Sequence, residues 1–154
     1  MRLRHASREE VVFTGAGTRA AFERCRALLW SYRFYPSSLV TTSFAKEKPR
    51  VGEVLRQQIR VGPLRFHGPV RVLDVRDEPA RAGYRYEAMP GDVERGIASF
   101  DLALSGDTVR FCIESDSAPA HWLARLFPFI ARAIQRRAVE GAFASMRSAA
   151  EGRA

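Results

Sequence analysis

Residues that build metal centres and disulfide networks are scarce in this sequence. It has two cysteines and three histidines among 154 residues. Cys25 and Cys112 are too far apart for a metal knuckle and too few for a disulfide framework, so we expect ordinary thiols in a reducing cytoplasm. His5 and His67 are isolated, and no second histidine or cysteine lies near His121. The sequence therefore predicts no metal site.

A phosphate-binding loop is missing as well. Gly15 and Gly17 form a lone G-x-G, without a third glycine or a following Lys-Ser/Thr pair. Loops that hold nucleotide cofactors need those residues so that the backbone can approach the phosphates. We interpret the motif as a turn before a helix, and we expect no cofactor.

Long apolar runs are absent, and arginine interrupts every helical one. The sequence therefore predicts no membrane span, and the charged N-terminus lacks the apolar stretch of a signal peptide. A hydrophobic content of 46% and a charged content of 27% are ordinary for a globular protein. We expect one cytoplasmic domain over residues 1–154, with frayed ends at 1–9 and 148–154.

Lysine is almost absent, although the net charge is +8. Only Lys46 and Lys48 are lysine, and the arginines are spread from Arg2 to Arg153. A nucleic-acid-binding face normally gathers its basic residues in one patch. The distribution favours a generally basic surface, which makes nucleic acid an unfavoured partner.

The remaining pattern reads as one short strand, one helix, about six more strands and a long helix. The residues 10–14 predict the first strand and 19–32 the first helix, with Thr18 as its cap. Strands are then expected at 39–45, 52–61, 70–75, 84–89, 98–104 and 109–113. The segment 76–83 is expected to connect two of them, and Ser105-Gly106-Asp107 is a hairpin signal. Strands segregated from helices indicate an α+β fold with an antiparallel sheet covered on one face.

The final helix is expected over Pro119–Met146, with Pro119 in its first turn. At about 100° per residue, one side carries Leu123, Leu126, Phe127, Ile130 and Ile134, and the other side carries arginines. This one-sided pattern predicts that the apolar face lies on the sheet. Pro128 is expected to kink the helix or to end a first short piece of it. Beyond Gly141 the apolar residues change sides, which predicts a bend or a different contact surface for the tail.

This order of elements resembles the helix-grip fold of the START-like (SRPBCC) superfamily. In that superfamily a curved antiparallel sheet, here of about six or seven strands, wraps around a long C-terminal helix. The resemblance implies an apolar cavity between the sheet and that helix. It therefore implies a small apolar or amphipathic molecule as the partner.

Four stretches also resemble a family described only as a domain of unknown function. The first is Gly15, Gly17 and Phe22, the second is Val75, Asp77 and Glu78, and the last comprises Trp122 to Arg125 with Gln135 to Arg137. The central stretch resembles a pattern of the type L-P-G-H-P-E-x-G-E, matched here by Tyr84, Tyr86, Met89, Pro90, Gly91, Glu94, Gly96 and Phe100. This chain departs from it at Glu87-Ala88, Asp92 and Ile97, so a His–Glu pair of the pattern is not present. The resemblance implies a fold and no activity.

We expect residues from the strands and the final helix to line the ligand cavity. Tyr84 and Tyr86 share a strand face, where their hydroxyls would be polar contacts in an apolar space. Glu53 and Gln57 share the apolar strand face of Leu55, where they need hydrogen-bond partners or a cavity that contains water. The full set of predicted lining residues is Glu53, Gln57, Tyr84, Tyr86, Phe100, Phe111, His121, Trp122, Phe127 and Ile130.

Two alternatives remain open at the level of sequence. A cyclase- or hydrolase-like enzyme would need an acid or base in the same cavity, and His121, Glu53 and Glu87 are the candidates. A binder of nucleic acid or of an acidic partner would use Arg125, Arg132, Arg136 and Arg137. The sequence alone identifies no catalytic residue.

Overall fold

The computed structural model describes residues 5–14, 18–42, 48–90, 94–119 and 125–152. Within these residues, seven strands and two helices follow one another in the order strand, helix, six strands, helix. They are β1 (His5–Thr14), α1 (Thr18–Ser31), β2 (Val40–Thr42), β3 (Val54–Val61), β4 (Leu64–Glu78), β5 (Arg81–Ala88), β6 (Glu94–Ser105), β7 (Thr108–Pro119) and α3 (Pro128–Ala150). This order confirms the predicted α+β class.

The strands form one antiparallel sheet in the order β1-β7-β6-β5-β4-β3-β2. Consecutive strands from β2 to β7 are neighbours, so short turns suffice to join them. Gly62 and Gly106 supply the left-handed backbone at two of these turns, with φ of 57° and 60°. The β4–β5 connection is shorter than expected, because both strands continue into 76–83 and only Pro79 and Ala80 form the turn.

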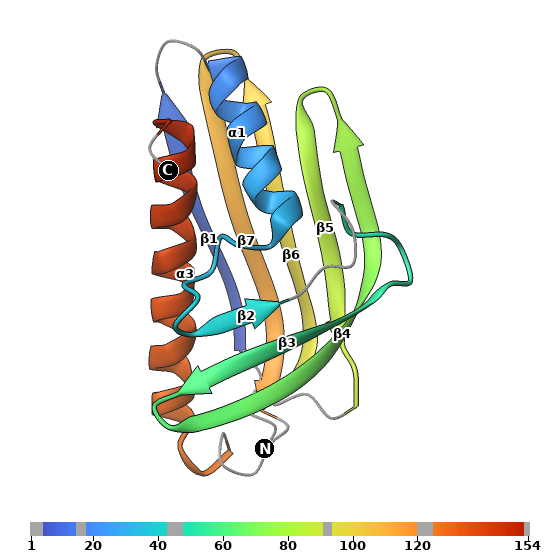
Figure 1. Ribbon diagram of the computed structural model, residues 1–154, viewed down its shortest axis with the longest axis vertical. Helices are drawn as coiled ribbons and strands as arrows, with labels where there is room; N and C mark the ends of the chain where they lie inside the picture. Colours follow the sequence, from blue (N-terminus) through green and yellow to red (C-terminus); the bar gives the residue numbers. More distant parts are fainter. Residues whose placement is uncertain (1–4, 15–17, 43–47, 91–93, 120–124, 153–154) are drawn as a thin grey trace.

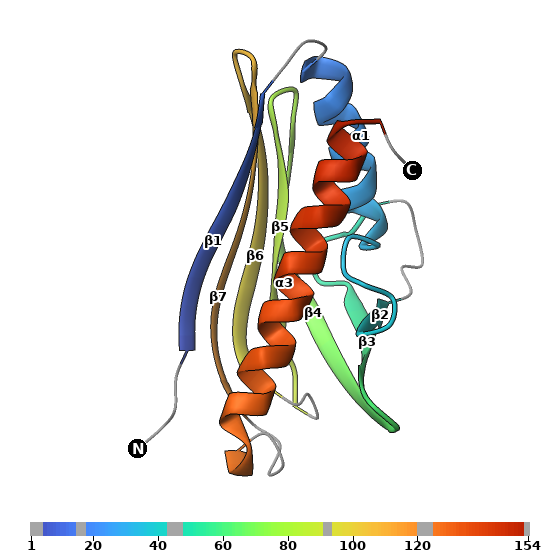
Figure 2. The same cartoon turned by 90° about the vertical axis from the view of Figure 1, so that its left-hand side faces the viewer.

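Both helices lie on the same side of the sheet. The sheet curls, and the second view shows α3 inside its curve, with β1 and β7 on one side and β3 and β4 on the other (Figures 1 and 2). α3 contacts α1, β7 and β1. It therefore runs along one edge of the concave face instead of over the middle of the sheet.

The start of the C-terminal helix differs from the prediction. Pro119 is the last residue of β7, not the first turn of the helix. α3 begins at Pro128, which occupies the first-turn position, and Phe127 is its N-cap. A proline has no backbone N–H to donate and its ring clashes with the preceding turn, so it starts a helix more readily than it continues one. The expected interruption at Pro128 is confirmed.

The face of α3 that meets the rest of the protein is not the predicted one. Ala138, Ala142 and Met146, spaced by four residues, are 8%, 0% and 0% exposed. Phe127 and Ile130 are 46% and 44% exposed instead. The prediction that this apolar face lies on the sheet is wrong for both. Periodicity places residues on one side of a helix, but it does not say which side the sheet covers.

The second half of α3 packs against α1. The Cys25 thiol lies 3.5 Å from the Met146 carbonyl oxygen, and Arg24 donates two bonds of 2.7 Å to the carbonyls of Ala149 and Ala150. The last carbonyls of a helix lack N–H partners in the following turn, and Ala149 also accepts from the Gly152 N–H at 3.1 Å, so Arg24 adds donors that stabilise the C-terminal end of α3. The prediction that the tail meets a different surface is confirmed.

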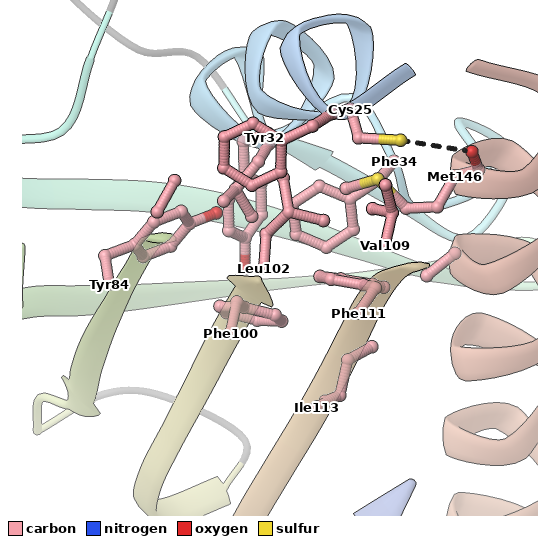
Figure 3. Close-up of a cluster of buried hydrophobic side chains, with 14 of the residues drawn as sticks. Cys25, Tyr32, Phe34, Tyr84, Phe100, Leu102, Val109, Phe111, Ile113 and Met146 are labelled. Carbon is pink, nitrogen blue, oxygen red and sulfur yellow. Dashed lines mark hydrogen bonds between the residues drawn. The ribbon is translucent and has the colours of Figure 1, made fainter. Parts of the chain in front are cut away.

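The largest buried cluster lies where α1, α3 and the middle strands meet (Figure 3). Its large side chains with no exposed surface come from α1, the connection after it, the strands and α3, namely Phe22, Leu29, Phe34, Leu102, Val109, Phe111 and Met146. A smaller cluster of Leu55, Val70 and Val72 lies on β3 and β4. In the described part of the chain, no helix is long and apolar enough to cross a membrane.

Candidate functional site

The four tyrosines of the sequence gather at one place beneath α1. Tyr32 and Tyr35 come from the connection after α1, and Tyr84 and Tyr86 from β5. Tyr32 has its ring centroid 5.8 Å from that of Tyr35, 6.0 Å from Tyr84 and 6.3 Å from Tyr86. Together with Gln57 on β3, these residues form what we call the tyrosine cluster.

Two hydroxyls of the tyrosine cluster differ in their hydrogen bonding. The Tyr32 hydroxyl lies 3.0 Å from the Tyr86 hydroxyl and 3.3 Å from the Gln57 Oε1, so it can donate to either. The Tyr84 hydroxyl is buried and has no partner among the described residues. A buried donor without an acceptor is costly, so the Tyr84 hydroxyl calls for a partner that the described residues do not supply.

Burial also fixes the charge of these phenols. It raises the pKa of Tyr32 and of Tyr84 well above the ordinary tyrosine value, and the neighbouring tyrosines raise both further. Both groups therefore stay protonated and remain hydrogen-bond donors at neutral pH.

The backbone at Tyr32 is held in an uncommon conformation. Its φ is 57°, in the left-handed region that favours glycine, and its N–H donates to the Leu29 carbonyl at 3.2 Å. A bulky residue in this region costs roughly 1–3 kcal/mol. The surrounding structure therefore holds the ring under α1 against its local preference.

The concave face changes character next to the tyrosine cluster. Tyr84, Phe100 and Phe111 are large and buried on β5, β6 and β7. Further along the same face the residues become small, and we call these the small-residue floor: Gly68, Ala88, Gly96, Ala98 and Ser115. All of them except Gly68 are partly exposed, although β5 and β6 are the middle strands of the sheet.

Most of the predicted strand residues come together here. The register places Tyr84 opposite Phe100 and Tyr86 opposite Ala98 on neighbouring strands, so the expected shared face of the two tyrosines is present. Phe100 is 5.1 Å from Tyr84 between ring centroids. Gln57 is 9% exposed and takes part in the hydrogen bonding described above.

Glu53 and Glu87 do not join this group. Glu53 precedes β3, and its carboxylate accepts a bond of 2.9 Å from the Arg50 backbone N–H, which stabilises a turn. Glu87 alternates with Tyr86 along β5 and therefore points to the opposite face, where Arg71 lies 4.0 Å away.

The predicted residues of the final helix lie apart from the tyrosine cluster or outside the described residues. His121 and Trp122 fall in 120–124, which the structure does not describe. Phe127 and Ile130 are half-exposed at the start of α3. Gly141 is on the same side of this helix as Ile130, since eleven residues make about three turns. Pro36 closely covers Gly141, so the connection after α1 shields this side of α3 at Gly141.

Sequence reasoning missed Tyr32, Phe34 and Tyr35. All three follow α1 directly, and Phe34 is fully buried. The signal was present as the aromatic run Tyr32-Arg33-Phe34-Tyr35 before Pro36. Aromatic residues at a helix end are not expected in a solvent-exposed loop, because burying such rings is strongly favourable.

The described residues hold no group of three or more His, Cys, Asp or Glu side chains that could bind a metal ion. Cys25 and Cys112 are buried free thiols. Burial raises the pKa of the Cys25 thiol to about 11, although the charge of Arg24 lowers it somewhat. A thiol this basic is a poor nucleophile and a poor metal ligand at neutral pH.

A curled antiparallel sheet with a C-terminal helix inside its curve defines a helix-grip fold, the fold of START-like proteins. Solved structures with this architecture match nearly the whole chain. The protein TTHA0849 from Thermus thermophilus aligns over 96% of this chain and 98% of its own, with a TM-score of 0.68 and 11% identity. A norcoclaurine synthase from Thalictrum flavum, in complex with dopamine and hydroxybenzaldehyde, aligns over 98% and 86%, with a TM-score of 0.55 and 10% identity.

The chain belongs to the DUF1990 family, which is described as a domain of unknown function. The family model matches residues 2–145. No curated protein matches the sequence. Family and fold are compatible with ligand binding, and neither supplies an activity.

Proposed function

We propose that this protein binds a small apolar or amphipathic molecule between the concave face of the sheet and α3. The observation that carries the proposal is the small-residue floor. Its alanines lie on middle strands that would be buried in a solid core, yet Ala88 and Ala98 are partly exposed. Small side chains at the floor leave room above the sheet. A short distance along the same face, large residues fill the corresponding room.

The helix opposite supports the same proposal. The residues of α3 one or two turns before the buried Ala138 are Ala131, Ile134 and Gln135, which are only partly buried. Ala131 and Ala98 are both small side chains, so neither adds much bulk between the helix and the sheet. A molecule bound there would remove apolar surface from water, at about 25 cal/mol per Å². The norcoclaurine synthase of the same fold was solved with two small aromatic molecules, which is consistent with this use of the architecture.

The two acid–base candidates that the structure describes do not favour an enzyme. Glu53 is engaged in a turn, and Glu87 points away from the concave face. Arg132, Arg136 and Arg137 of α3 are exposed, as on an ordinary solvated helix face. Ligand binding is therefore the function that we propose.

The test is to fill the space and measure binding of a neutral apolar dye. Phenylnaphthylamine fluoresces on leaving water, and titrating it into the protein gives an affinity. We expect saturable binding to the unchanged protein and a loss of at least about tenfold in affinity in Ala98→Phe. Ala103→Phe is the matched control, because Ala103 is on the same strand and faces the other side. Equal affinities for all three proteins would overturn the proposal.

A further inference from the structure

We infer that the tyrosine cluster holds the polar end of the bound molecule, and that this end is an uncharged hydrogen-bond acceptor such as a carbonyl oxygen. The inference rests on the proposed function and specifies its ligand. It follows from the donors, the charges and the position of the tyrosine cluster.

The first step concerns the donors. The Tyr84 hydroxyl is buried without an acceptor, while Tyr32 already has two acceptors within reach in Tyr86 and Gln57. The Tyr84 hydroxyl is therefore a donor that the described residues leave without an acceptor. An acceptor oxygen brought by the ligand would pair with it, and would recover the free energy lost when this hydroxyl was buried.

The second step concerns charge. The causes of the raised pKa at Tyr32 and Tyr84 are burial and other tyrosines, and no cationic side chain among the described residues lowers either pKa. A carboxylate or phosphate would thus lose its hydration without gaining a counter-charge, which is strongly unfavourable. A neutral carbonyl keeps most of the hydrogen-bond strength and avoids that cost.

The third step concerns position. Tyr86 is half-buried and pairs across the strands with Ala98, so the tyrosine cluster and the small-residue floor adjoin. A ligand with its carbonyl at the tyrosine cluster would lay an apolar body over the floor. Figure 3 shows Tyr84 reaching from β5 toward Tyr32 beneath α1. The surrounding structure holds Tyr32 in its left-handed backbone conformation, which keeps its ring in this arrangement.

The experiment compares three probes that differ at one substituent: acetylnaphthalene, isopropylnaphthalene and naphthoate, all substituted at the same ring carbon. Their affinities are measured by competition with phenylnaphthylamine. We expect acetylnaphthalene to bind about 2- to 12-fold more tightly than isopropylnaphthalene, since one hydrogen bond separates them. Naphthoate should bind most weakly.

The variant Tyr84→Phe removes the donor and keeps the ring. The preference for acetyl over isopropyl should fall below about twofold, while isopropylnaphthalene binds as before. The infrared carbonyl stretch of bound acetylnaphthalene gives a second readout. It should lie at a lower frequency in the unchanged protein than in Tyr84→Phe, because a hydrogen bond weakens the carbonyl bond.

The outcomes separate the two proposals. Equal binding of the acetyl and isopropyl probes, a preference that survives Tyr84→Phe, or tightest binding of naphthoate would each overturn the inference and leave ligand binding standing. Failure of all three probes to bind would overturn the proposed function, and the inference with it.

Discussion

Removing the phenolic hydroxyl should destabilise the protein at Tyr32 but not at Tyr84. The Tyr32 hydroxyl lies within 3.0 Å of Tyr86 and 3.3 Å of Gln57. Tyr32→Phe removes its hydrogen bond and leaves buried acceptors without a donor, which should cost about 1–3 kcal/mol. The Tyr84 hydroxyl has no partner among the described residues. Tyr84→Phe removes an unsatisfied buried group and should raise stability by about 1 kcal/mol or leave it unchanged.

Urea unfolding followed by circular dichroism measures both variants beside the unchanged protein. A difference of about 2 kcal/mol between the two variants separates their midpoints by roughly 1 M at an m-value of about 2 kcal/mol per M. The m-value should be the same in all three proteins, so that the midpoints report stability alone. A loss in Tyr84→Phe as large as that in Tyr32→Phe would refute the reasoning, because Tyr84 would then have a partner to lose.

Two further predictions concern the packing of α3 and the buried thiol. A Cβ at Gly141 would lie 2.1 Å from the Pro36 Cγ, so Gly141→Ala should destabilise by about 1–3 kcal/mol in a urea titration, against the usual gain from alanine in a helix. The exposed Ala144 is the control: Ala144→Gly should cost only about 1 kcal/mol, and the reverse ranking would contradict the close contact. Burial raises the pKa of Cys25 to about 11, so stability should fall as pH rises from the ordinary thiol value of about 8.5 toward 11, where only the unfolded chain releases its proton. Urea titrations across that range measure the effect, and a flat profile would contradict it.

The strands could be predicted from the sequence because alternation and turn residues act locally. Val109, Phe111 and Ile113 alternate with polar residues, and Gly106 marks the turn before them, so the last hairpin needed no further information. The antiparallel order followed from the short connections. The face shared by Tyr84 and Tyr86 followed from the period of two.

What the sequence could not supply was the placement of the long helix. Phe127, Ile130 and Ile134 form the more apolar stripe, yet α3 buries the stripe of Ala138, Ala142 and Met146. The deciding contact comes from elsewhere in the chain, because α1 and Pro36 approach the C-terminal half of α3 and need small residues there. A close approach of two elements cannot be read from the periodicity of one of them.

Only the strand residues of the candidate site could be predicted, because the other contributions depend on contacts between elements. The alternation of residues along each strand predicted the contributions of Gln57, Tyr84, Tyr86 and Phe100. Tyr32 was not, since its role depends on a left-handed residue that turns the chain back beneath α1. The small-residue floor was also missed, because alanines and glycines on strands carry meaning only beside the large residues of neighbouring strands.

The central claim is that the concave face above Ala98 is not filled by the protein itself, and the unfolding free energy of Ala98→Phe tests it most directly. Our account predicts a value within about 0.5 kcal/mol of the unchanged protein, as for a side chain added to open space. A phenyl ring forced into a packed interior would cost about 1–3 kcal/mol or more. A loss of that size in Ala98→Phe, with Ala103→Phe unaffected, would contradict the account.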